Sequence, residues 1–218
     1  MNAFMRSALS ATLLIGLCGS AISDEKNDRL FKAAKEGNAK EVETALASGA
    51  AVDARDANGV TPLMFAAIAG HIRIAEILIK SKASVDERNR GGSTALFMAV
   101  ANSHANVAKT LISNGANVNV RSREMANTTP LIWASMRGYT DVARLAIEKG
   151  AEVNATDAIG ATALTGAASM GYLELVKLLV DKGADINVKM VDGASALQLA
   201  SKRGRSDIVA FLRSKGAN

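Results

Sequence analysis

The chain has 218 residues, of which 49% are hydrophobic and 22% charged, a balance typical of a globular protein rather than a disordered one. The formal charge is only +5 and 4% of the residues are aromatic, which argues against a nucleic-acid-binding protein, because such proteins concentrate basic residues and interleave them with stacking aromatics. The scarcity of aromatic side chains also favours closely packed helices over a sandwich of strands, so we expect an all-α protein.

Residues 1–21 have the layout of a secretory signal peptide. Arg6 is the only charge, an apolar run covers residues 8–17, and small residues at 19–21 end the segment. The run is much shorter than the roughly 20 apolar residues that span a membrane. We therefore expect cleavage near Ala21, a short spacer over residues 22–27, and a periplasmic or secreted protein with no stable membrane insertion afterwards. An uncleaved anchor and a buried helix are the alternatives.

Cys18 is the single cysteine, so cleavage after Ala21 leaves a chain that cannot form a disulfide. A domain of this length can be stable through packing alone. Cys18 also leaves open a lipid anchor, as in bacterial lipoproteins, although Leu17 directly before it is too large for the usual cleavage box.

From residue 28 onward the sequence repeats. Five strings that begin with Thr or Ser and continue x-Leu-x-x-Ala start at residues 61, 94, 129, 162 and 195. Thr or Ser can cap a helix, and Pro62 and Pro130 suit the first helical position. Glycines nine residues later can end that helix in a left-handed conformation, and a second apolar stripe at helical spacing then ends at another glycine.

Each unit closes with Gly-Ala-Asn/Asp-Val/Ile-Asn or a close variant, as in residues 115–119 and 183–187. Together with the spacing and the Thr-Pro-Leu start, these residues resemble the ankyrin repeat over residues 28–218. The resemblance implies a solenoid of stacked helix-turn-helix units with β-hairpin-like fingers. We expect six units, of which the outer two are caps: 28–59, 60–92, 93–127, 128–160, 161–193 and 194–218.

The chain departs from the family pattern at three kinds of position. The position after Thr-Pro-Leu, which usually holds histidine in the family, holds Met64, Phe97, Ile132, Thr165 and Gln198. Apolar packing must therefore replace the polar contact between units that the histidine usually makes. Lys82 and Ser103 stand where glycine is expected, which predicts left-handed backbone at residues with side chains. The finger over residues 122–127 is two residues longer than the others, and insertions in solenoids commonly lie on a binding face.

The chain offers little for catalysis. His71 and His104 lie one unit apart in a slot where the family commonly has a structural histidine, and no mature cysteine remains. Trp133 shares its slot with other apolar residues and is interpreted as core. We expect no metal, no cofactor and no enzymatic activity; an enzyme with a novel site on the concave face is the rival hypothesis.

The resemblance places a partner on the concave face of finger tips and first helices. The residue before each tip is Arg55, Arg88, Arg121, Thr156 and Lys189, and near them on the same face lie Arg90, Arg123, Arg137, Lys202 and Arg203, with Met136, Met170 and Ile159. Guanidinium groups among flexible thioethers suit an acidic protein surface. The alternative is that these charges merely fill solvated surface slots.

The sequence thus predicts a non-catalytic, monomeric scaffold or adaptor that binds a protein outside the cytoplasm. The alternative is an accessory factor that stabilises or inhibits a specific periplasmic enzyme.

Overall fold

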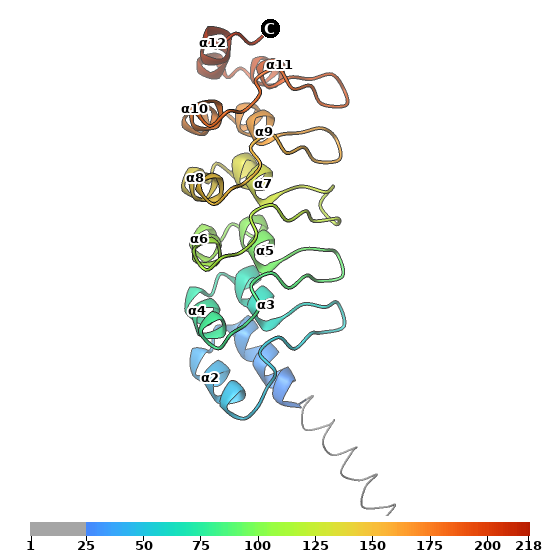
Figure 1. The fold of residues 1–218 in the computed structure, drawn as a ribbon, viewed down its shortest axis with the longest axis vertical. Coiled ribbons are helices and arrows are strands. Elements are labelled where there is room, and N and C mark those ends of the chain that lie inside the picture. The colour runs from blue at the N-terminus through green and yellow to red at the C-terminus, as the bar shows by residue number, and fades with distance from the viewer. Residues whose placement is uncertain (1–24) are drawn as a thin grey trace, which may run out of the picture.

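The computed structural model describes residues 25–218; the expected signal peptide, with Cys18, and residues 22–24 of the expected spacer lie outside this range. Its helices form a regular stack (Figure 1). In chain order they are a helix over residues 25–36, α2 (Ala39–Ala47), α3 (Pro62–Ala69), α4 (Ile72–Lys80), α5 (Ala95–Ala101), α6 (Ala105–Ser113), α7 (Pro130–Arg137), α8 (Thr140–Glu148), α9 (Ala163–Met170), α10 (Leu173–Asp181), α11 (Ala196–Lys202) and α12 (Ser206–Ser214).

The even-numbered helices line one side of the stack, the odd-numbered helices form the middle layer, and finger-like loops project on the other side (Figure 1). We call these the outer helices, the inner helices and the fingers. Within residues 25–218 strand-like pairing is limited to two isolated bridges, Ser122 with Thr128 and Lys189 with Ser195. The all-α solenoid expected from the sequence is confirmed.

Each inner helix from α3 onward begins at a hydroxyl residue with extended backbone, whose side chain accepts a hydrogen bond from the backbone N–H three residues later. These residues are Thr61, Thr94, Thr129, Thr162 and Ser195. Thr165 and Gln198 return the bond to the capping residue and so complete capping boxes in α9 and α11. In these two units the residue at the position that usually holds histidine therefore helps to cap the start of its helix. In the other three units this position holds the buried residues Met64, Phe97 and Ile132.

Small side chains let neighbouring inner helices approach closely. The equivalent alanine of each inner helix from α3 onward has no solvent exposure: Ala66, Ala99, Ala134, Ala167 and Ala200. The outer helices contribute a stripe of larger side chains to the same core, including Ile74, Leu111 and Leu175. The core therefore runs along the whole stack, between the two helix layers.

Side chains at the start of the outer helices tie each unit to the one before it. His71 Nε2 lies 3.1 Å from Lys35 O, and His104 Nε2 lies 2.9 Å from Ile68 O. The His104 ring also covers Gly70, as Tyr172 covers Gly138 in a later pair of units. The structural role expected of both histidines is confirmed.

The fingers are tied by carboxylate and amide side chains at their bases. Asp53 and Asp86 each accept a hydrogen bond from a backbone N–H of the following unit. Asn119 accepts from Glu152 N at 2.9 Å and donates to Gly150 O at 2.9 Å. Each unit thus fixes the position of the next one in the stack.

Lys82 and Ser103 both have the left-handed backbone predicted for them, with φ of 71°. We expect Lys82→Gly to raise the free energy of unfolding by about 1 kcal/mol, because glycine adopts this conformation without a steric penalty. Urea denaturation followed by circular dichroism would measure the change. Lys182→Gly is the matched control, since Lys182 ends α10 with φ of −94°. An equal gain in both variants would contradict backbone strain as the cause.

Candidate partner-binding surface

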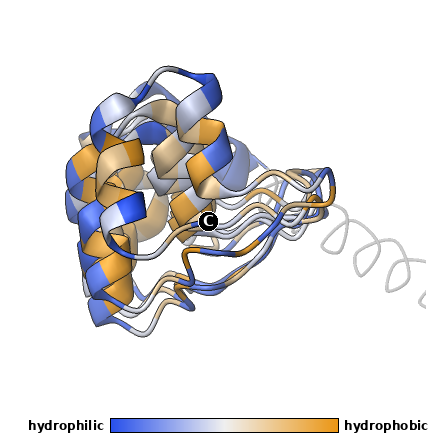
Figure 2. Cartoon of the chain, turned by 90° about the horizontal axis from the view of Figure 1, so that it is seen from above, coloured by the Kyte–Doolittle hydropathy of each residue, from blue (hydrophilic) through white to orange (hydrophobic). Residues whose placement is uncertain are grey.

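The helices and the fingers form the two arms of an L-shaped cross-section when the stack is viewed along its length (Figure 2). Backbone hydrogen bonds join successive finger tips: Arg90 N donates to Asn58 O, Arg123 N to Gly91 O, Ala158 N to Ala126 O, and Val191 N to Ile159 O, at 2.8 to 3.0 Å. The tips are therefore held in register and present one continuous surface.

Two of the finger carboxylates are occupied within their own turns. Asp56 Oδ1 accepts from Asn58 N and Val60 N, and Asp157 Oδ1 accepts from two backbone N–H groups in the same way. Such turns are typical of aspartate. These carboxylates stabilise the finger conformation while they keep their negative charge.

The structure divides the predicted basic row into two groups. Arg55 Nη1 donates to Arg88 O at 3.0 Å, and Arg55 also forms an ion pair with Glu87. Arg121 Nη1 donates to Thr156 O at 2.6 Å and to Asn127 O at 3.2 Å. Both guanidinium groups link neighbouring fingers, a role that the repeat spacing did not reveal.

The other predicted basic side chains are exposed on the fingers or at the ends of the inner helices: Arg88, Arg90, Arg123, Arg137, Lys189, Lys202 and Arg203. No hydrogen bond within residues 25–218 holds the side chain of Arg88 or Lys189 in the way that Arg55 and Arg121 are held. Arg203 Nη1 lies 3.7 Å from Met170 Sδ, across two neighbouring inner helices. These seven residues remain the predicted contacts for an acidic partner.

The long finger folds over the tip before it. A Cβ added to Gly91 would lie 1.9 Å from Glu124 Cδ, so the Glu124 side chain occupies the space that Gly91 leaves open. Ala126 and Asn127 have φ of 51° and 59°, and this left-handed pair turns the finger where the others use a glycine. The two extra residues therefore lie on the finger surface and lean toward the preceding unit.

The inner helices present a partly exposed row on the same side as the fingers. The row consists of one residue from each helix: Phe65, Met98, Trp133, Gly166 and Leu199. Trp133 packs against the core and lies 6.1 Å from Phe97 between ring centroids, while the Arg137 guanidinium lies 5.7 Å from the Trp133 ring. The side chain thus belongs partly to the core, as expected, and partly to the surface.

Large apolar side chains are exposed on this surface and not on the outer helices. In the described part of the chain these residues are Met125, Met136, Ile159, Met170 and Val191, and each lies in a finger or on an inner helix. Met136, Met170 and Ile159 were predicted from the sequence to lie on the partner-binding face. Met125 and Val191 were missed, and their occurrence at finger tips is the signal that could have found them. All five lie between residues 125 and 191, so the exposed apolar surface is concentrated in the C-terminal half.

The described residues give little support for a metal site, a membrane-spanning helix or a catalytic pocket. Residues 25–218 contain no group of three His, Cys, Asp or Glu side chains that could hold a metal ion. None of the helices in this range is both long and apolar enough to cross a membrane. A hollow of about 480 Å³ lies beside α4, but its lining mixes Glu43 and Glu76 with Arg73 and Lys80 and shows no catalytic arrangement.

Comparison with known proteins identifies the repeat. A family model described as ankyrin repeats (3 copies) matches residues 30–122, 122–190 and 160–218. One similar chain comes from the structure of the Bd0816 predatory endopeptidase from Bdellovibrio bacteriovorus in complex with immunity protein Bd3460; it is 31% identical, with a TM-score of 0.78, over 86% of this chain and 97% of that one.

Two further solved structures are similar. An ankyrin repeat domain from Acinetobacter baumannii AYE is 31% identical, with a TM-score of 0.78, over 87% of this chain and 98% of that one. The human ASB11 ankyrin repeat domain is 24% identical, with a TM-score of 0.76, over 87% of this chain and 84% of that one. At this identity the likeness supports the fold alone. No curated protein matches the chain in sequence.

Proposed function

Since this chain belongs to the ankyrin-repeat family, whose stacked units bind other proteins, we propose that it holds a partner protein on the surface of its fingers and inner helices, without catalysing a reaction. The single observation that carries this proposal is the location of the five exposed large hydrophobic residues, all of which lie on that surface. Exposed apolar side chains that gather on one face mark interaction sites.

The charge of the surface supports an acidic partner. Seven exposed basic side chains lie on the fingers or at the ends of the inner helices, and they outnumber the exposed carboxylates at the finger tips, Glu124 and Asp192. Two copies of the chain would bring like charges together through this face, so the protein acts as a monomer. Binding to an acidic protein would weaken as salt concentration rises.

A second candidate function is inhibition or stabilisation of one exported enzyme. It is favoured by the similarity of this chain to one in a complex between an endopeptidase and an immunity protein. In both candidates the same surface binds the partner, and they differ in whether the partner's activity changes. An assay of the captured partner with and without the protein would separate them.

We place this function outside the cytoplasm, on the basis of the signal-like pattern in residues 1–21. Intact mass measurement of the protein from fractionated cells would test the placement. A periplasmic species that begins near Ile22 is the expected result, and a cytosolic species that retains Met1 would contradict it. A lipid-modified species that begins at Cys18 would replace cleavage at Ala21 with the anchored alternative.

Charge reversal on the two faces of the stack tests the binding surface. Arg123→Glu with Arg203→Glu should weaken recovery of the partner about tenfold or more, because both groups are exposed on the proposed surface. The measurement is capture with crosslinking from an extract of the source cells, followed by mass spectrometry. Arg121 is unsuitable, because its replacement would also remove the hydrogen bond to Thr156 O.

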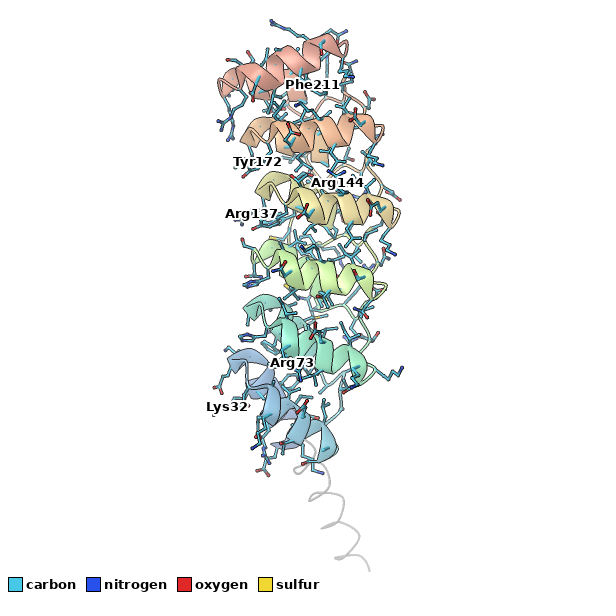
Figure 3. All side chains as sticks on the ribbon, turned by 90° about the vertical axis from the view of Figure 1, so that its left-hand side faces the viewer. Lys32, Arg73, Arg137, Arg144, Tyr172 and Phe211 are labelled. Carbon is cyan, nitrogen blue, oxygen red and sulfur yellow. The ribbon has the colours of Figure 1, made fainter. Side chains whose placement is uncertain are left out.

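The matched control is Arg73→Glu with Arg144→Glu, which changes the net charge equally. Both residues lie on the face of the outer helices (Figure 3). This variant should recover the partner as the unchanged protein does. Equal losses in the two variants would point to a general charge effect and would contradict the assignment of the binding surface.

A further inference from the structure

The exposed methionines of residues 25–218 all lie on the candidate surface. Met125, Met136 and Met170 are 41%, 39% and 40% exposed, whereas Met64 is fully buried. Residues 25–218 contain no cysteine, so methionine supplies all the sulfur in this range. A peroxide, which oxidises accessible thioethers, would therefore modify this surface before it modifies the core.

One of these three sulfur atoms already contacts a hydrogen-bond donor. Arg203 Nη1 lies 3.7 Å from Met170 Sδ, the only hydrogen bond to a methionine sulfur in the described part of the chain. Arg203 forms no ion pair within residues 25–218. Because a thioether is a weak acceptor, this contact leaves the guanidinium free to turn toward a partner.

Met170 also occupies a position that is basic in both neighbouring units. Arg137, Met170 and Arg203 are equivalent residues, each at or directly after the end of its inner helix. The segments around them, 134–138, 167–171 and 200–204, include no Asp or Glu. No carboxylate of these segments therefore competes for the Arg203 guanidinium.

Oxidation would convert the weak contact at Met170 into a strong one. The sulfur gives an electron pair to one oxygen of hydrogen peroxide and the O–O bond breaks. That oxygen stays on sulfur as a sulfoxide, and its proton passes to the other oxygen, which leaves as water; sulfur loses two electrons and the peroxide gains them. The sulfoxide oxygen lies one bond from Sδ and is a strong acceptor, and a charged donor makes such hydrogen bonds about twice as strong as neutral ones.

We propose that Met170 is an oxidation site at which a peroxide lowers the affinity of the surface for its partner. The proposal rests on the function proposed above and adds its regulation. The sulfoxide makes an apolar contact polar, and it draws the Arg203 guanidinium onto Met170 and away from the carboxylates of an acidic partner. Met136 is about as exposed but has no donor at its sulfur, so oxidation there should cause only the first of these changes. Methionine sulfoxide reductases would restore the surface.

A stability cycle on the purified protein tests the contact without a partner. Met125→Leu with Met136→Leu leaves Met170 as the exposed methionine of residues 25–218, and peptide mass spectrometry after hydrogen peroxide treatment should find a sulfoxide at Met170. In this background Arg203→Ala should lower the urea midpoint of unfolding by about 0.3 M more after oxidation than before it, because only the sulfoxide is a strong acceptor. Arg213→Ala, on α12, is the matched control and should have the same effect in both states. An unmodified Met170, or an equal effect of Arg203→Ala in both states, would overturn the proposal.

Partner recovery tests the consequence for binding. In the capture experiment with crosslinking, each variant is compared with itself before oxidation and after oxidation followed by removal of the peroxide. Recovery should fall about tenfold when Met170 is the exposed methionine, and about twofold or less in Met125→Leu with Met170→Leu, where Met136 takes that place. Both variants keep Met98 and Met190, so the comparison isolates Met170.

The outcomes separate this proposal from the proposed function. Equal losses in the two variants would assign the effect to polarity alone and would overturn the role of Met170. Unchanged recovery after oxidation would overturn the regulation and leave protein binding in place. If no partner is recovered even before oxidation, the proposed function fails, while the stability cycle still decides whether Arg203 binds the sulfoxide.

Discussion

Replacing Gly70 with alanine is expected to lower the free energy of unfolding by about 3 kcal/mol, through two effects at one site. Gly70 ends α3 with φ of 78°, a left-handed conformation that an alanine adopts only with strain. An added Cβ would lie 2.4 Å from His104 Nδ1, so the ring must move and weaken its 2.9 Å contact with Ile68 O. Urea denaturation followed by circular dichroism would measure the loss.

Gly115→Ala separates the two effects. Gly115 has φ of 87°, but no atom lies within 4 Å of an added Cβ, so only the backbone strain of about 1 kcal/mol should appear. In a protein that already carries His104→Ala, the cost of Gly70→Ala should fall to that of Gly115→Ala. Equal costs for Gly70→Ala and Gly115→Ala in the unchanged background would show that the ring does not hold the two units together.

Most of the fold could be predicted from the sequence because each unit carries its own local signals. Thr61 followed by Pro62 marks the start of a helix, and Gly70 marks its end, whatever lies elsewhere in the chain. The register of the repeat also made exceptions visible, so the left-handed backbone at Lys82 and Ser103 could be predicted although neither is glycine. Contacts in a solenoid are made between neighbours, and local signals therefore carry most of its architecture.

The candidate surface could be predicted less well, because the role of each basic residue depends on whether its side chain reaches a neighbouring finger. Arg55, Arg88 and Arg121 occupy equivalent positions, yet two of them bond to a neighbouring finger. Arg121 reaches Asn127 O because the long finger turns through a left-handed pair, a conformation that the spacing of the repeat does not specify. Equal spacing in sequence thus concealed unequal roles in the structure.

The apolar part of the surface was also hard to separate from the core. Trp133 lies at helical spacing, which is typical of buried residues, and only the stacking of the helices shows that it remains partly exposed. At Gly166 the Met136 side chain takes the space of a missing side chain, with Met136 Cγ 2.9 Å from the position of an added Cβ. The sequence alone does not show this contact.

Phe97→Ala is expected to cause the largest loss of stability among these variants, about 4 kcal/mol, the usual cost of removing a fully buried aromatic side chain. Phe97 is 1% exposed and lies 6.1 Å from Trp133 of the next unit, between ring centroids. It occupies the slot that the family usually fills with histidine, so at this junction the tie between units is apolar. Phe97→Leu keeps most of the volume and should cost only about 1 kcal/mol.

The pattern of unfolding should change along with its midpoint. Since each unit contacts only its neighbours, a cavity at Phe97 weakens one junction of the stack and leaves the others intact. Trp133 is the only tryptophan, so its fluorescence reports on that junction, whereas circular dichroism reports on all helices. In Phe97→Ala the fluorescence transition should occur at lower urea than the circular dichroism transition, while the two should coincide in the unchanged protein and in Phe97→Leu. Coincident transitions in Phe97→Ala would mean that the array unfolds as one unit even with this junction weakened, because the coupling between units then exceeds what a single apolar tie contributes.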